Sequence, residues 1–266
     1  MKIFFPIEDK KFQVDFSKGI DISIPLIFNG PQPNTYEVTS ATSNAYKDNN
    51  FIGDTREGGP CNFETYHFTP HCNGTHTECI GHITKERVSI LECLDEEIIP
   101  SYLISIRATK SNEKYNPPLE NEDLVITKEQ LTKKIEGKDS SFLKGLIIRT
   151  IPNLENKKER NYMKKTSPFF TVEAMEYIVS LGVKHLLVDI PSVDRLFDDG
   201  ILSAHNIFWE TDNKKLNLRA SKKTITEMIF VPNKIIDGKY LLNLQFAPFV
   251  SDASPSRPVL YQINEI

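Results

Sequence analysis

The segment between residues 145 and 190 most constrains the fold, because two apolar runs flank one helical pattern. The runs Gly145–Ile151 and Val183–Ile190 are rich in branched aliphatic residues, which favour buried strands. Between them, Thr171 suits a helix N-cap, and Gly182 suits the left-handed residue that often follows a helix. A strand, a helix and a strand at this spacing predict parallel pairing through a right-handed crossover. The chain is therefore predicted to be an α/β protein.

Alternating apolar residues predict further strands on both sides of this unit. Thr127 and Gln130 have the spacing of a capping box, which predicts a short helix containing Leu131 and Ile135. The stretch Asn29–Pro60 is rich in Gly, Pro, Asn and Ser, so we expect a long surface loop that could cover a site or a neighbouring subunit. The expected flanking strands are Lys11–Phe16, Asp21–Leu26, Asn62–Thr69, Pro100–Arg107 and Leu241–Phe246.

The length and composition allow one large domain. The chain has 266 residues, of which 39% are hydrophobic and 26% are charged, as in ordinary globular proteins. We favour a single domain over residues 1–266, with a mixed β-sheet and few helices. The four cysteines are predicted to be free thiols or metal ligands rather than disulfides.

Charge and hydropathy argue against two classes of partner. The net charge is −4 and the basic residues are dispersed, so neither nucleic-acid nor acidic-membrane binding is expected. The N-terminus has no apolar core of a signal peptide, and no run approaches the roughly 20 apolar residues of a membrane-spanning helix. We therefore predict a cytoplasmic protein that acts on a small molecule.

The stretch Pro70–His82 concentrates metal-binding side chains. It holds three of the six histidines and two of the four cysteines, together with Glu78. Imidazole, thiolate and carboxylate are the ligands that zinc, manganese or iron(II) prefer, whereas calcium or magnesium would require oxygen ligands. Packing alone does not explain such crowding, so the stretch predicts a transition-metal site.

The spacing suggests which side chains converge. If the chain is extended on both sides of Gly74, then Cys72, His76 and Glu78 lie on one face, and His71 lies on the other. His82 shares the favoured face but lies further along, where it would reach the reacting water rather than the metal.

These residues resemble the signature of the cyclase family of metal-dependent hydrolases, which includes bacterial kynurenine formamidase and isatin hydrolase. The signature is His-x-Gly-Thr-His-x-Asp-x-Pro-x-His, and this chain has Cys-Asn-Gly-Thr-His-Thr-Glu-Cys-Ile-Gly-His from Cys72 to His82. The matching residues are Gly74, Thr75, His76 and His82; the departures are Cys72, Glu78 and Ile80. Three alternatives follow for the first ligand: Cys72 binds the metal, His71 replaces it through a one-residue bulge, or the site is degraded.

Weaker resemblances extend along the chain. The stretch Asp189–Asp194 is similar to the family's Asp-x-Pro-Ser-x-Asp turn, which implies a substrate-binding role for Ser192 and Asp194, although the residues alone favour a local turn. The family also implies a later histidine and glutamate in the metal site. We assign these to His205 and to Glu227, with Glu210 as the alternative glutamate, because an acid among strand formers is costly to bury unless it is paired.

Two further expectations come from the same resemblance. A closing turn like Gly-Ser-Pro-x-Arg places Arg257 where it could clamp a substrate carboxylate, with a structural ion pair as the alternative. The family also implies a swivelling β/β/α architecture and a homo-oligomer.

The main hypothesis is a metal-dependent, kynurenine formamidase-like hydrolase of an amide, formamide, lactam or ester bond. We expect zinc, with manganese as the alternative, and His82 as the catalytic proton carrier. One rival is a scaffold of the same fold without activity, and another is a hydrolase with Cys72 or Cys79 as nucleophile. The expected metal ligands are Cys72 or His71, His76, Glu78, His205 and Glu227.

Overall fold

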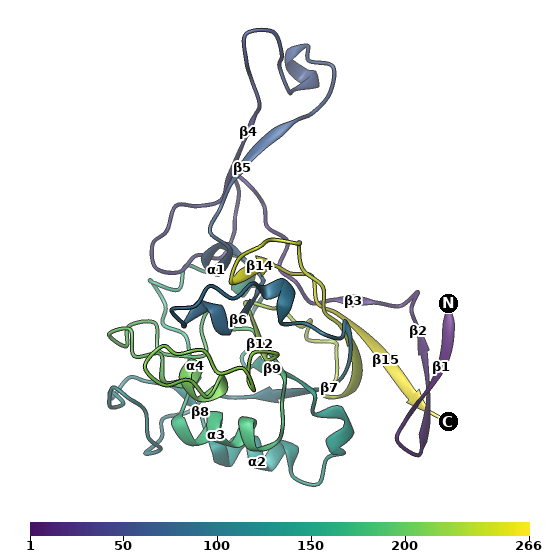
Figure 1. Cartoon of the computed structure of the whole chain (residues 1–266), viewed down its shortest axis with the longest axis vertical. Helices are drawn as coiled ribbons and strands as arrows, with labels where there is room; N and C mark the ends of the chain where they lie inside the picture. The colour runs from purple at the N-terminus through teal and green to yellow at the C-terminus, as the bar shows by residue number, and fades with distance from the viewer.

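A mixed sheet of 11 strands runs through the protein, and the three longer helices pack against one face of it (Figure 1). The computed structural model describes residues 1–266. The strand order is β1-β2-β15-β13-β7-β9-β11-β12-β6-β14, with β3 also paired to β15. This arrangement confirms the predicted α/β class with a mixed sheet and few helices.

The centre of the sheet is parallel. Its four strands are β7 (Ile98–Ile106), β9 (Gly145–Thr150), β11 (His185–Val188) and β12 (Thr224–Glu227). Helix α3 (Val172–Ser180) joins β9 to β11, as the sequence predicts. The hydroxyl of Thr171 accepts a hydrogen bond from the backbone N–H of Ala174, and Gly182 has a φ of 76°. The predicted caps therefore set both ends of this helix.

Antiparallel strands extend the sheet in both directions. The strand β6 (His76–Cys79) pairs with β12, and β14 (Ala253–Pro255) pairs with β6 at that edge. The strands on the other side are β13 (Gly238–Asn243), β15 (Val259–Glu265), β3 (Ile20–Asp21), β2 (Lys10–Asp15) and β1 (Lys2–Ile7). Strand β6 thus lies between a parallel-sheet strand and a strand from the end of the chain.

Alternation along the central strands divides the core into two layers. Leu146 and Ile148 belong to a cluster of 26 buried residues under the helices, whereas Ile147 belongs to a cluster of 11 on the opposite face. The helices on the first face are α2 (Lys128–Ile135), which has the predicted capping box at Thr127 and Gln130, α3, and α4 (Ser203–Phe208).

A long hairpin projects from the body of the protein (Figure 1). Its strands are β4 (Thr42–Ala45) and β5 (Glu64–His67), and rings of Tyr46, Phe51 and Phe63 pack together beyond them. The remaining short elements are η1 (Thr55–Glu57), α1 (Pro70–Asn73), η2 (Ile80–His82), η3 (Ile90–Glu92), β8 (Val125–Ile126), η4 (Ser140–Phe142), η5 (Glu155–Glu159) and β10 (Phe169–Phe170).

Three local predictions need correction. The expected loop Asn29–Pro60 contains β4, because its partner strand follows it and closes a hairpin. The strand expected over Asp21–Leu26 ends at Asp21, since the N–H of Ile24 donates instead to the Thr75 hydroxyl at 2.8 Å. The strand expected over Leu241–Phe246 ends at Asn243. No helix has the length and apolar character needed to cross a membrane.

His185 makes stability depend on pH. It is buried at the start of β11, where burial lowers its pKa to about 4, with Lys144 and Lys184 adding to the effect. Between pH 6.5 and 4, His185 is protonated in the unfolded chain but neutral in the folded chain. The free energy of unfolding therefore rises with pH in this window. We expect this residue to remove roughly 2 kcal/mol of stability between pH 7 and pH 5. Urea unfolding of the wild type and His185→Gln checks this, since an identical pH dependence in both proteins would contradict it.

Candidate metal centre

Two neighbouring strands place the innermost donors. In the antiparallel register of β6 and β12, Glu227 lies opposite His76, and Glu78 lies two residues further along β6. Because side chains alternate along a strand, His76 and Glu78 point to the same face. His76 Nε2 lies 3.5 Å from Glu227 Oε2, and all three side chains are buried.

His205 reaches the same group from α4. Its Nε2 is 3.0 Å from Glu78 Oε1 and 3.8 Å from Glu227 Oε1. Asp194 accepts hydrogen bonds from the backbone N–H groups of Ala204 and His205, and its Oδ2 lies 2.5 Å from His205 Nδ1. The Asp194 carboxylate holds the imidazole with Nε2 toward the two glutamates, where Nε2 donates to Glu78 and where a bound cation would replace its proton.

His76 has an equivalent arrangement. Its Nδ1 lies 3.0 Å from the carbonyl oxygen of Gly74, and a carbonyl can only accept, so Nδ1 carries the proton. The buried Nε2 then presents a lone pair and has no hydrogen-bond partner. A buried polar atom without a partner costs about 1–3 kcal/mol, and coordination of a cation would remove that cost.

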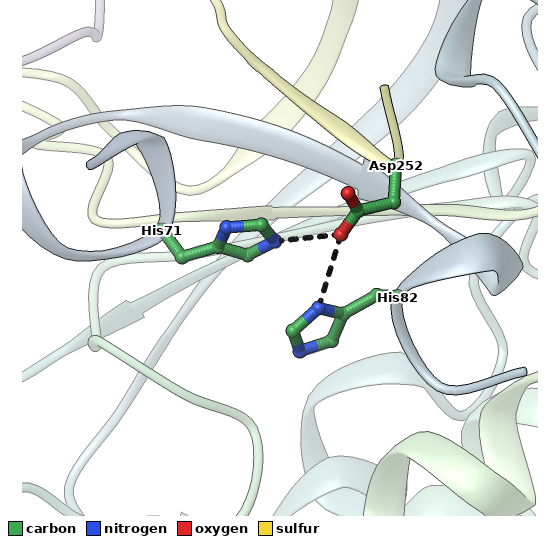
Figure 2. A group of neighbouring side chains, drawn as sticks. All are labelled: His71, His82 and Asp252. Carbon is green, nitrogen blue, oxygen red and sulfur yellow. Dashed lines mark hydrogen bonds and ion pairs between the residues drawn. The ribbon is translucent and has the colours of Figure 1, made fainter. Parts of the chain in front are cut away.

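His71 and His82 form the outer part of the group. His71 Nε2 is 3.6 Å from Glu78 Oε2 and 3.2 Å from Asp252 Oδ2. His82 Nε2 is 3.7 Å from Glu78 Oε2, and its Nδ1 is 3.3 Å from Asp252 Oδ2. Figure 2 shows both rings directed at this one carboxylate. Three overlapping sets of donors lie close enough for a metal ion: His76, Glu78 and Glu227; Glu78, His82 and His205; His71, His82 and Asp252.

The backbone before Gly74 corrects the predicted spacing. Residues Pro70–Asn73 form a helical turn rather than an extended chain, so alternation does not apply to His71 and Cys72. The turn brings His71 to the donor group, whereas the buried Cys72 belongs to none of the three sets. Residues Ile80–His82 likewise form a 3-10 turn, which directs His82 back toward Glu78.

The carboxylates of the group have only imidazoles as counter-charges. The carboxylates of Glu78, Asp194, Glu227 and Asp252 form ion pairs with histidines alone, and no Lys or Arg reaches them. Burial opposes the charge of Glu78, yet His82 and His205 hold its pKa below the usual range. The pKa of His205 is correspondingly raised by Asp194 and Glu78 against the effect of its own burial. A cluster of carboxylates whose only counter-charges are imidazoles suits a divalent cation.

The raised pKa values of the Cys72 and Cys79 thiols disfavour a nucleophilic role. Burial, together with the charge of Glu227, raises the pKa of Cys72 to about 11. A hydrogen bond with Cys93 and burial also raise the pKa of Cys79. Reactive cysteines have a lowered pKa, so the protonation of both thiols disfavours the cysteine-nucleophile hypothesis.

The other predicted residues lie at the edge of the group or away from it. The Ser192 hydroxyl accepts the N–H of Asp194 at 3.1 Å, as in the local turn considered as an alternative, while Asp194 orients His205. Arg257 donates to Asp21 at 2.7 Å and its side chain is 75% exposed, so it adopts the structural ion pair. The alternative glutamate, Glu210, pairs with Lys223.

Sequence reasoning missed Asp252 and Tyr36. Asp252 directly precedes β14, whose pairing with β6 brings Ala253 opposite Glu78. The resemblance of the closing turn to the family's Gly-Ser-Pro-x-Arg turn could have indicated this segment, but it pointed to Arg257 rather than to Asp252. Tyr36 has a φ of 56°, and burial and the charge of Glu227 raise the pKa of its hydroxyl. Its ring meets Phe197 edge to face at 6.3 Å.

Comparison with known proteins decides the family. The model of the Cyclase family matches residues 20–195. The chain belongs to the cyclase family. This confirms the resemblance seen in the signature between Cys72 and His82.

Solved structures of cyclase-family proteins share the fold. A predicted metal-dependent hydrolase from Bacillus stearothermophilus has a TM-score of 0.60 and 15% identity, over 92% of this chain and 98% of the other. An isatin hydrolase bound to the product analogue thioisatinate has a TM-score of 0.62 and 14% identity, over 93% of each chain. Isatin hydrolase A from Labrenzia aggregata, bound to benzyl benzoate, has a TM-score of 0.61 and 15% identity, over 92% and 93%. No curated protein matched the chain by sequence.

Asp194 should control metal affinity through His205. Asp194→Asn replaces the charged acceptor at Nδ1 by a neutral amide, so the imidazole is held less firmly with its Nε2 toward the glutamates. We expect zinc affinity to fall about 10- to 100-fold, as for other partners of metal-binding histidines. Competition with a chromophoric chelator measures this. Asp199→Asn, at an exposed position of the same loop, is the matched control; equal losses in both variants would contradict the assignment.

Proposed function

We propose that this protein is a metal-dependent hydrolase of a non-peptide C–N bond in an amide, formamide or lactam. The observation that supports this most is the buried convergence of His76, Glu78, His205 and Glu227, with the Nε2 atoms of both imidazoles directed at carboxylates. Membership of the cyclase family and the fold shared with metal-dependent hydrolases agree with this function.

The donor set fits zinc, with manganese as the alternative. Imidazole and carboxylate suit both ions, and the unpartnered Nε2 of His76 lies among the carboxylates that would share the ion. His76, Glu78 and Glu227 would hold the ion, with His205 on the adjoining side of Glu78. When bound, the ion would polarise the scissile carbonyl and lower the pKa of water toward neutrality.

His82 would move the proton. Its Nδ1 faces Asp252, an acceptor, which keeps the proton on that nitrogen and leaves the Nε2 lone pair free on the side of Glu78. The side chain is 29% exposed, so water and substrate can reach it. Nε2 would accept a proton from the attacking water and return it to the departing nitrogen.

An aromatic pair that begins at Tyr36, near Glu227, favours an aryl substrate. Tyr36 lies near Glu227, and its ring meets Phe197 edge to face. Phe197 also lines a cavity of about 200 Å³, whose other apolar walls include Met163, Phe169 and Leu196. N-formyl aryl amides and isatin-like lactams are therefore the first substrates to test; aryl esters share the same reactive carbonyl.

Chelation separates this function from its rivals. We expect dipicolinate to abolish hydrolysis of these substrates and zinc or manganese to restore it, while iodoacetamide has no effect because the thiols near the centre are protonated. Hydrolysis that survives chelation but not alkylation would instead indicate a cysteine nucleophile. Failure to bind either metal under any loading would indicate a scaffold without activity.

His82→Ala tests the proton transfer. Loss of a general base lowers kcat by about 10²- to 10⁴-fold, while the tightly bound metal should remain because His76, Glu78 and Glu227 are intact. His67→Ala is the matched control, since His67 is exposed on the projecting hairpin. Steady-state kinetics and elemental analysis give both readouts. Normal turnover by the His82 variant would remove this residue from the mechanism.

A further inference from the structure

A second set of donors lies outside the buried group, around Asp252 (Figure 2). His71 comes from α1, His82 from the turn after β6, and Asp252 from the turn before β14. Their side chains are 27%, 29% and 29% exposed. Segments far apart in the sequence thus present two imidazoles and one carboxylate at a position that solvent can reach.

The separations from Asp252 are longer than those of strong hydrogen bonds and suit ligands that share a cation. His71 Nε2 and His82 Nδ1 lie 3.2 Å and 3.3 Å from the same oxygen, Asp252 Oδ2. Charge-assisted hydrogen bonds are usually shorter, about 2.7–2.9 Å. Two ligands at about 2.0–2.1 Å from one tetrahedral zinc ion are about 3.3 Å apart. The two separations from Asp252 Oδ2 therefore match two edges of a zinc coordination shell.

Two more observations point to a ligand. The Nε2 of His71 is buried at the atom level and has no hydrogen-bond partner. The rings of His71 and His82 stack at 4.5 Å with an interplanar angle of 26°, which holds both imidazoles beside the carboxylate. With three protein donors and one open side, water would complete a four-coordinate site.

We propose that His71, His82 and Asp252 form a second, weaker zinc site at the mouth of the buried centre. The site differs from the buried one in its donors, because His71 precedes the first position of the family signature and Asp252 lies near the end of the chain. In the second site, His82 would coordinate zinc through Nδ1, whereas its Nε2 faces Glu78 of the buried centre.

Occupation of this site has a consequence for proton transfer. A neutral imidazole has one N–H and one lone pair. When the Nδ1 lone pair of His82 binds zinc, Nε2 must carry the proton and cannot accept another. Excess zinc therefore inhibits hydrolysis by removing the base. This consequence depends on the proposed function, but the zinc site itself does not.

Zinc titration of the metal-free protein tests the site. His71→Gln and Asp252→Asn should each bind one zinc fewer than the wild type, or bind the weaker zinc at least 10-fold less tightly, with the tightest binding unchanged. His67→Gln, at an exposed position, is the control and should match the wild type. Circular dichroism verifies that every variant is folded. Wild-type stoichiometry and affinity in both variants, or loss of the tightest zinc instead, would overturn the proposal.

Glu227→Gln distinguishes this site from the buried one. It should weaken the tightest zinc and retain the weaker one, because Glu227 contacts His76 and His205 but not Asp252. Loss of the weaker zinc alone would overturn the second site.

Hydrolysis rates measured with and without excess zinc test the inhibition, with each protein compared with itself. Excess zinc should slow the wild type and should not slow Asp252→Asn. A wild-type rate that is unchanged at zinc concentrations that fill the weaker site would refute the inhibitory role.

Discussion

The buried carboxylate of Glu78 is the constraint around which the site is organised. It is 1% exposed and has no Lys or Arg partner, so its charge depends on three imidazoles, from His71, His82 and His205. These come from α1, the turn after β6 and α4, and each has its position fixed by a different part of the fold. A charge buried this deeply is stable only when it is compensated. Glu78 therefore links the packing of the sheet to the ability of the site to hold a cation.

Much of the fold was predictable because local signals agreed with the global arrangement. The crossover from β9 through α3 to β11 follows from two apolar runs and two caps, and the α2 capping box from Thr127 and Gln130. The site was partly predictable for a different reason. The spacing of His76 and Glu78 survives because both lie on β6, and Glu227 was recognisable as an acid within strand β12. A single domain, a homo-oligomer and a cytoplasmic location stay predictions.

What the sequence could not reveal depends on non-local geometry. The alternation rule fails at Cys72 because Pro70 begins a helical turn, which exchanges the positions expected for His71 and Cys72. Asp252 reaches the centre only because β14 pairs with β6, a contact across more than half of the chain. Tyr36 depends on a backbone with positive φ in a loop, which no periodic pattern indicates. In this chain Cys72 and Glu78 replace the first histidine and the aspartate of the family signature. The donor group also contains His71 and Asp252, which are not part of that signature.

We propose that a cation lies between β6 and β12, bound by Glu78, Glu227 and the otherwise unpartnered Nε2 of His76. Anomalous diffraction at the zinc absorption edge, from crystals grown with zinc, tests this most directly. We expect a strong peak about 2.0–2.2 Å from His76 Nε2 and from the carboxylates of Glu78 and Glu227. Anomalous peaks confined to the protein surface, with His76 Nε2 bonded to another group, would contradict it.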